Sequence, residues 1–363
     1  MAAEVQETPK MHRRTALGLG TSLGVALALP ALRVARAQGQ APEMTLRLHH
    51  FLPAVSNVHR FFLVPWANKV AADSQGRLKI QIFPAMQLGG APPQLFDQAR
   101  DGVADIIWTL PGNTPGRFPK VEVFELPFVS HKRAIVNCLA IQEYADAVLQ
   151  DEFREVHPLC VWGHGEGLIH SRKQVTTMED LAGMKLRFPS RLNGEALRAL
   201  GAAPVGMPVP QIPEAMTQGV IDGAVVPWEV VPSIRLQEMA KFHTEIPGSP
   251  TLYIATFILA MNKAKYEGLP PELRAVLDAN SGAVAARMAA VPWDERGPIV
   301  EAEAKKRGNT VTVISEAEKA RWVEKTNAVV DNWVAGSKEK GFDGAALLAQ
   351  ARALVAKHGA GIA

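Results

Sequence analysis

Arg187 is the side chain best placed to bind an anionic ligand, because it lies near the end of an apolar segment, residues 184–188. An arginine grips a carboxylate through two parallel hydrogen bonds, since its guanidinium presents donors in a fixed, planar fork. Pro189 forces the chain to turn, as expected where a buried strand leaves its sheet. In isolation, a surface arginine paired with an acid would explain the residue as well. At a strand end that faces a cleft between domains, we favour a ligand contact.

Four other side chains follow the ends of apolar segments and are further candidates for ligand contact: His50, Trp108, Trp228 and Glu229. Ligand clefts in α/β proteins open at the carboxyl ends of strands, which is where these residues are predicted to lie. A tryptophan offers a flat apolar wall, although core packing explains either tryptophan nearly as well. Glu229 can accept a hydrogen bond from a ligand hydroxyl, or it can hold a cation.

Patterns that would indicate catalysis are weak or incomplete. Residues 163–167, Gly-His-Gly-Glu-Gly, have the spacing of a hydrolase nucleophile elbow, but Glu166 occupies the place of the nucleophile. We interpret this segment as a flexible crossing between domains, and we include Glu166 among the candidate ligand contacts. The histidines lack the spacing of metal ligands, so Glu229 is the single visible candidate for a metal site. We therefore predict no enzyme, no cofactor and no bound metal.

The elements that position these side chains alternate between strand and helix. Two successive βαβα sets, in residues 44–109 and 158–226, are typical of parallel sheets covered by helices. Residues 252–261 are predicted to form a long strand that returns from the second domain to the first. Residues 270–307, rich in alanine, are predicted to form one long helix. The sequence thus predicts an α/β fold of two lobes whose cleft closes on a ligand by a hinge motion.

The chain length also favours two domains, because the 326 residues after residue 37 exceed the ~250–300 at which single cores usually split. Strands of each set are separated in the sequence by the other set, so we expect the chain to cross between lobes more than once. We expect the first lobe to comprise residues 44–163 plus about 253–300. The second lobe is expected to comprise residues 164–252 plus about 305–363.

The N-terminal segment has the layout of an export signal. Arg13 and Arg14 precede a charge-free apolar stretch, residues 15–32, and a small-x-small triplet follows at residues 35–37. The arginine pair indicates the twin-arginine route, which exports folded proteins. The alternative, a retained membrane helix, is disfavoured because several glycines and Pro30 interrupt the stretch. We expect residues 1–37 to be removed and the mature protein to be periplasmic.

Charge and cysteine content limit the possible partners. The chain has 39 Lys and Arg and 36 Asp and Glu; five of the basic and two of the acidic residues lie in residues 1–37, which leaves 34 of each sign. This balance is unlike the basic footprint of a nucleic-acid binder, so we expect no nucleic-acid partner. Cys138 and Cys160 could pair in an oxidising compartment, but we favour two separate buried thiols.

Six ordered motifs between residues 46 and 285 resemble a known family of transport receptors. They read FPAMQLGG at 83–90, DGVAD at 101–105, ELPF at 125–128, EDLAGMKLR at 179–187, LGAAPV at 200–205 and QGVIDG at 218–223. In this order they resemble the substrate-binding subunits of tripartite ATP-independent periplasmic (TRAP) transporters, of the DctP type. Each motif is weak alone, and their shared order carries the resemblance.

The resemblance implies a monomeric receptor with the fold of periplasmic binding proteins: two α/β lobes, an interdomain cleft and a long helix that bridges the lobes. Such a receptor delivers an organic acid to the membrane subunits of a TRAP transporter. Arg187 falls on the family's carboxylate-binding arginine. Val226 stands where many members have asparagine, and Gly167 stands where the sialic-acid branch has a second arginine. We therefore expect an apolar wall formed by Val226, Phe188, Trp228 and Val209.

The expected ligand is a monocarboxylate with a hydrophobic or aromatic body, with or without a 2-oxo or 2-hydroxy group. The reason is that one fork arginine is set among apolar and aromatic residues. Some branches of the family hold 2-oxo acids through a metal ion, for which Glu229 is the single candidate here. Two alternative functions are the receptor of an ABC importer and the ligand-input protein of a periplasmic sensor kinase. An ABC receptor would lack the six motifs, and neighbouring genes would distinguish a sensor protein.

Overall fold

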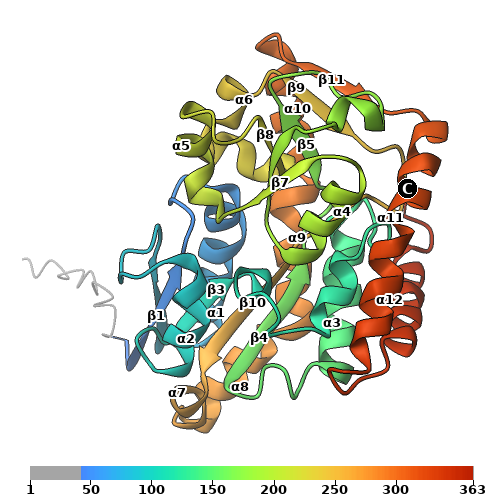
Figure 1. Ribbon diagram of the computed structural model, residues 1–363. Helices are drawn as coiled ribbons and strands as arrows, with labels where there is room; N and C mark the ends of the chain where they lie inside the picture. Colours follow the sequence, from blue (N-terminus) through green and yellow to red (C-terminus); the bar gives the residue numbers. More distant parts are fainter. Residues whose placement is uncertain (1–41, 363) are drawn as a thin grey trace, which may run out of the picture. The chain divides into compact units, whose positions relative to one another are not determined.

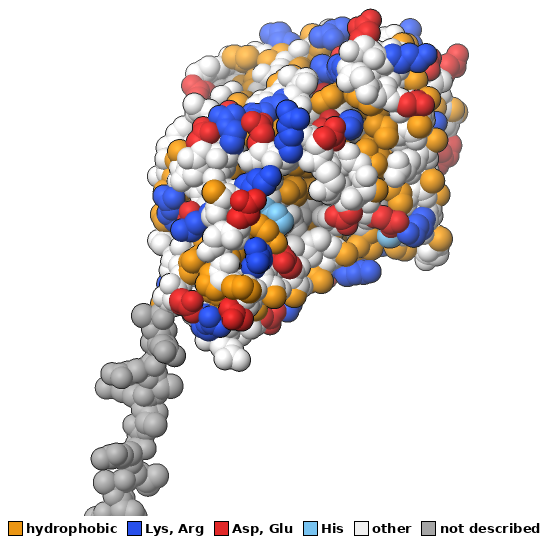
Figure 2. All heavy atoms as spheres, turned by 90° about the horizontal axis from the view of Figure 1, so that it is seen from below, with side chains coloured by type: hydrophobic (Ala, Val, Ile, Leu, Met, Phe, Trp, Pro, Cys, Tyr) orange, Lys and Arg blue, Asp and Glu red, His pale blue; other side chains and the backbone are white. Residues whose placement is uncertain are grey.

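The computed structural model describes residues 42–362, so the predicted export signal lies outside the described residues. The described residues form a mixed α/β fold with two β-sheets, as the sequence predicts, and helices flank both sheets (Figure 1). Across residues 42–362, no helix has the length and apolar character that a membrane span requires. On the face that Figure 2 shows, basic and acidic side chains are interspersed rather than gathered by sign.

The first sheet has five strands in the order β2-β1-β3-β10-β4. β1 is parallel to β2 and β3, whereas β10 runs antiparallel to both of its neighbours, β3 and β4. The strand predicted over residues 252–261 is β10, which begins later than predicted, at Thr256. The five strands are β1 (Met44–His50), β2 (Leu78–Phe83), β3 (Ile106–Thr109), β4 (Val156–Gly163) and β10 (Thr256–Asn262).

The second sheet has six strands in the order β11-β9-β5-β8-β6-β7. β6 is parallel to β7 and β8, and β5 is antiparallel to β8 and β9. The strands are β5 (Leu168–Ser171), β6 (Lys185–Phe188), β7 (Ala203–Gly206), β8 (Gly223–Val226), β9 (Phe242–Glu245) and β11 (Thr310–Val313). The chain crosses between the sheets after β4 and again before β10, so each sheet is built from separated parts of the sequence.

Helices cover the sheets with their apolar faces. α1 packs on β2, α3 packs on β4, and α4 packs on β6 and β7. The helices before β10 are α1 (Val64–Asp73), α2 (Leu95–Arg100), α3 (Ala134–Val148), α4 (Arg191–Ala199), α5 (Ile212–Thr217) and α6 (Leu236–Met239). A π-helical turn, η1 (His59–Leu63), precedes α1, and a 3-10 helix, η7 (Trp228–Ile234), follows β8. After β10 comes α7 (Lys263–Glu267).

The single long helix predicted over residues 270–307 is wrong, because the structure has three helices there: α8 (Pro271–Ala279), α9 (Gly282–Asp294) and α10 (Gly297–Lys306). Tertiary contacts explain the first break. The carbonyl of Asn280 accepts a hydrogen bond from Trp66 Nε1 at 2.7 Å, and its side-chain amide donates to Asp73 at 2.8 Å. Gly282 adopts a φ of 57°, which glycine tolerates better than other residues.

The bridge between the two sheets consists of two consecutive helices. α9 packs against α3 and β4 beside the first sheet, and α10 packs against η7 and β11 beside the second (Figure 1). The C-terminal helices are α11 (Glu316–Ser337), which packs on α4, and α12 (Gly344–Gly359), which packs on α3. Because the contacts join residues 42–362 into one compact unit, the division into lobes at the bounds given above stays a prediction. Cys138 and Cys160 are both free and buried.

Candidate ligand-binding site

A small cavity of about 40 Å³ is lined by residues of both sheets. Trp108 of β3 and Phe257 of β10 contribute from the first sheet. Arg187 of β6 and Val226 of β8 contribute from the second sheet. The cavity is therefore placed where a hinge motion between two lobes would enclose a ligand.

Arg187 is held rigidly at this cavity by backbone carbonyls. Its Nε donates to the carbonyl of Met207 at 2.8 Å, and its Nη1 donates to the carbonyl of Val225 at 3.1 Å. The residue is only 2% exposed, and no carboxylate of residues 42–362 forms an ion pair with it. Burial lowers the pKa of Arg187 to about 10, which still leaves it charged at neutral pH. Burying a cation without a counterion costs desolvation free energy, and an anionic ligand group that pairs with this arginine would offset that cost.

Aromatic rings form the wall around the cavity. The rings of Trp108 and Phe257 lie 5.8 Å apart, and Phe257 stacks on Trp293 of α9 at 5.6 Å with an interplanar angle of 21°. Phe51 packs against the other side of Trp108 at 4.8 Å. Such a wall favours a flat, apolar ligand body. Two hydrogen-bond donors of the wall, Trp108 Nε1 and Trp293 Nε1, have no partner within residues 42–362.

Tyr253 occupies the space beside Gly167. A Cβ atom added at Gly167 would lie 2.2 Å from Tyr253 Cζ, so no larger residue fits there while the ring keeps its place. The Tyr253 hydroxyl is buried without a partner among the described residues, and burial raises its pKa. An aromatic ring with one hydroxyl thus fills the space beside Gly167.

Glu229 is the second residue of η7 and also lines the cavity. One carboxyl oxygen accepts a hydrogen bond from the backbone nitrogen of Val58 at 3.2 Å, and the backbone carbonyl accepts one from Asn57 Nδ2 at 2.8 Å. The residue is 3% exposed, and burial raises the pKa of its carboxyl group to about 8. Near neutral pH the group is therefore mostly protonated and can both donate and accept hydrogen bonds.

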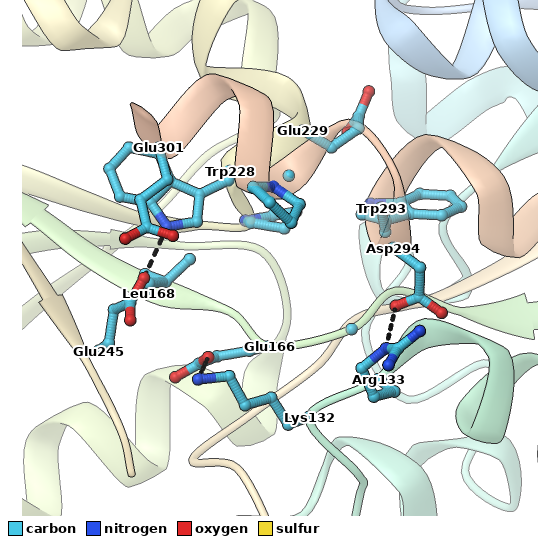
Figure 3. A pocket seen from close by; sticks show the side chains of 14 residues that line it. Lys132, Arg133, Glu166, Leu168, Trp228, Glu229, Glu245, Trp293, Asp294 and Glu301 are labelled. Atoms are coloured by element: carbon cyan, nitrogen blue, oxygen red, sulfur yellow. Dashed lines mark hydrogen bonds and ion pairs between the residues drawn. The ribbon is translucent and has the colours of Figure 1, made fainter. Parts of the chain in front are cut away.

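A second pocket of about 300 Å³ adjoins the first and shares Pro227, Glu229 and Trp293 with it. Four of its charged residues form two ion pairs (Figure 3). Lys132 Nζ lies 2.9 Å from Glu166 Oε2, and Arg133 Nε lies 3.3 Å from Asp294 Oδ1. Figure 3 shows the Glu229 carboxyl pointing away from Lys132 and Glu166. We call this space the adjoining pocket, and the cavity around Arg187 the ligand cavity.

Charged groups of the adjoining pocket also bond to the backbone and to an indole. The other Glu166 oxygen accepts a hydrogen bond from the backbone nitrogen of Ile246 at 2.7 Å. Burial raises the pKa of Glu166 to about 7, against the opposing effect of the Lys132 ammonium. Trp228 Nε1 donates to Glu245 Oε1 at 2.9 Å. Within residues 42–362, no cluster of three or more histidine, cysteine or acidic side chains is arranged to hold a metal ion.

The structure brings some of the predicted site residues together and not others. The ligand cavity contains Trp108, Arg187, Val209, Val226 and Glu229, and the adjoining pocket contains Glu166, Trp228 and again Glu229. The roles of these residues as ligand contacts stay predictions. His50 and Phe188 line neither space.

Strand alternation explains why Phe188 lies away from the cavity, whereas His50 packs beside Trp108, its partner in the sheet register. Successive residues of a strand point to opposite faces, so Phe188 faces away from Arg187's side. Its ring lies over Gly194 and Gly206, where an added Cβ would come within 2.9 Å. His50 lies behind Trp108, with ring centres 5.4 Å apart, and is hydrogen-bonded to His59 at 2.9 Å.

The residues of the ligand cavity that were not predicted from the sequence include His164, Tyr253, Phe257 and Trp293. His164 Nδ1 donates to the carbonyl of Gly165 at 2.7 Å, and its Nε2 accepts from the backbone nitrogen of Ala255 at 2.8 Å. Burial lowers its pKa to about 4, so this imidazole is neutral and fully hydrogen-bonded. The aromatic residues come from the returning segment and from α9, and their only sequence signal is their place in apolar stretches.

Comparison with known proteins agrees with this architecture. Residues 48–336 match the family of bacterial extracellular solute-binding proteins, family 7. A TRAP solute-binding protein from Rhodoferax ferrireducens T118, in complex with copurified benzoate, is 44% identical, with a TM-score of 0.85 over 88% of this chain and 100% of its own.

Two further solved structures are similar. A marine metagenome TRAP protein specific for aromatic acids, in complex with 3-hydroxybenzoate, is 43% identical, with a TM-score of 0.85 over 88% of this chain and 99% of its own. A TRAP protein from Bordetella bronchiseptica with bound (R)- and (S)-mandelate is 28% identical, with a TM-score of 0.80 over 86% of this chain and 99% of its own. All three relatives are receptors rather than enzymes.

Proposed function

Because the chain belongs to the bacterial extracellular solute-binding proteins of family 7, the periplasmic receptors of TRAP transporters, we propose that its ligand is an aromatic monocarboxylate. In this proposal Arg187 binds the carboxylate, and the rings of Trp108, Phe257 and Trp293 enclose the ligand body. The receptor then delivers the acid to the TRAP membrane subunits.

One observation carries the proposal: a buried arginine without a counterion faces a small cavity walled by aromatic rings. A dicarboxylate or a sugar acid would need further donors, and an apolar wall supplies few of them. The relatives with bound benzoate, 3-hydroxybenzoate and mandelate support the same ligand class.

Three finer points belong to this proposal. Residues 1–37 direct export through the twin-arginine route and are removed. The mature chain works as a monomer. Two lobes, divided near residues 163, 253 and 305, close over the ligand by a hinge motion.

A thermal-shift series on the purified protein tests the ligand class. It compares benzoate with its uncharged analogue benzamide, and with succinate and a sugar acid. Ligand at a hundred times its dissociation constant stabilises by ~2.7 kcal/mol. At ~2–4 °C per kcal/mol, aromatic acids should raise the Tm by about 5–10 °C, and benzamide should not. Shifts from succinate or sugar acids alone would contradict the proposed ligand class.

A further inference from the structure

The ligand cavity contains an arginine and a glutamate that do not pair with each other. Arg187 bonds to two backbone carbonyls, and the Glu229 carboxyl bonds to the backbone nitrogen of Val58. No ion pair joins the two residues, although both line the same small space. Charged groups that share a cavity ordinarily compensate one another, so their separation leaves each available to a different part of a ligand.

Glu229 keeps unused hydrogen-bonding capacity in a place that water hardly reaches. Glu166 and Glu152 use both of their carboxyl oxygens: Glu166 bonds to Ile246 and Lys132, and Glu152 bonds to the backbone nitrogens of Lys120 and Val121. The Glu229 carboxyl forms one hydrogen bond among the described residues, and the residue is only 3% exposed. Its second oxygen is therefore available to bond to a ligand group.

The backbone around Glu229 is anchored, so the carboxyl is held in place. Asn57 Nδ2 donates to the Glu229 carbonyl, while Val58 donates to its side chain. Both donors come from the segment between β1 and η1, beside the first sheet, whereas Glu229 follows β8 of the second sheet. These contacts join the two predicted lobes and fix the carboxyl at the wall of the ligand cavity when the lobes are closed.

On the basis of the proposed function, we infer that Glu229 is a specificity-determining residue that receives a hydroxyl group of the ligand. The preferred ligand is then a hydroxylated aromatic acid, with the carboxylate on Arg187 and the hydroxyl on Glu229. A ligand without a hydroxyl would bury Glu229 with its remaining lone pairs and proton unpaired. Sites built to hydrogen-bond a hydroxyl discriminate strongly against analogues that lack it.

Calorimetric titration of the full chain with matched ligand pairs tests this inference. The pairs are benzoate with 3- and 4-hydroxybenzoate, and phenylacetate with mandelate. We expect at least one hydroxylated acid to bind ~10- to 100-fold more tightly than its parent, the range for one hydrogen bond to an ionisable group. Glu229→Met should bring that ratio close to one. Glu229→Gln keeps an acceptor for Val58 and should retain an intermediate ratio.

The ratio separates recognition from a structural role. If Glu229 only held Val58 in place, its loss would weaken both ligands of a pair equally and leave the ratio unchanged. Glu301→Gln is the matched control, because Glu301 lines only the adjoining pocket and should leave the ratio as in the wild type.

The outcomes distinguish this inference from the proposed function. Tight binding of the unsubstituted acids with no preference for hydroxylated ones would overturn the inference alone. A preference that persists in Glu229→Met, or in Glu229→Gln at full wild-type strength, would overturn it too. Failure of every aromatic acid, with binding of other acids, would overturn both.

Discussion

The ligand cavity and the adjoining pocket share a wall, but the charged side chains that line them have different kinds of partner. In the adjoining pocket, Lys132 pairs with Glu166 and Arg133 pairs with Asp294. In the ligand cavity, Arg187 and Glu229 bond only to backbone groups. The adjoining pocket is the larger of the two, at about 300 Å³ against about 40 Å³.

This difference shows that size and number of charges do not identify a binding site. A charged side chain that already forms an ion pair must lose that partner before it can bind a ligand. The lost ion pair cancels most of the free energy that the ligand contact contributes. The two unpaired groups of the smaller cavity carry no such cost. The comparison therefore supports the proposal that the ligand binds in the smaller space.

The largest expected effect comes from replacing Arg187. Arg187→Met keeps much of the side-chain volume but removes the only cation of the ligand cavity. Loss of one partner of a buried charge pair costs ~2–5 kcal/mol, so affinity for an aromatic acid should fall ~30- to several thousand-fold in calorimetry.

Arg187→Lys is the matched control for that variant. It keeps the charge but loses the planar fork, so its affinity should lie between those of the wild type and Arg187→Met. The Tm of the ligand-free Met variant should not fall, since an unpaired buried charge has been removed. Unchanged affinity in Arg187→Met would place the site elsewhere.

An intermediate effect is expected from pH. The pKa of Glu229 is raised to about 8 and that of Arg187 is lowered to about 10, both by burial. Below pH 8 Glu229 is neutral and tolerates a carboxylate in the same cavity. Above pH 8 it ionises, so affinity should fall by up to ~tenfold per pH unit until Arg187 also titrates.

Glu229→Gln provides the control for the pH series, because its side chain cannot ionise. Its affinity should stay level between pH 8 and 9, below the pKa of about 10 at which Arg187 titrates. His164, whose pKa is about 4, does not titrate in this window. A wild-type affinity that is equally level across the window would contradict the assignment.

The smallest effect is expected in the adjoining pocket. The Lys132 side chain is 40% exposed, and such pairs are worth ~0–1 kcal/mol. Lys132→Met should therefore change affinity for an aromatic acid by less than ~fivefold. A loss as large as that of the Arg187 variant would show that the ligand occupies the adjoining pocket.

Much of the fold could be predicted because buried strands are continuous apolar segments. The βαβα set predicted over residues 44–109 begins where β1 begins and ends where β3 ends, with β2 between them. The breaks between α8, α9 and α10 could not be predicted. They depend on distant partners such as Trp66 and Asp73, which local periodicity does not encode.

The residues of the candidate site also fall into those that the sequence could predict and those that it could not. Arg187, Val226 and Glu229 could be selected because they lie at or just after a strand end, a position that topology alone makes functional. Tyr253, Phe257 and Trp293 could not be selected, because a returning segment and a helix face bring them in through tertiary packing. Phe188 was included only because its neighbour on the strand is Arg187, and the alternation of the strand turns it away.

The position of β10 also determines when the first sheet can be completed as the chain is synthesised. β10 lies between β3 and β4 and pairs with both, yet it begins at Thr256, long after β3 ends at Thr109 and β4 ends at Gly163. Until residue 262 has left the ribosome, β3 and β4 each expose an unpaired apolar edge, and such edges invite wrong pairing. The part of the protein that is translated first is therefore among the last to finish folding.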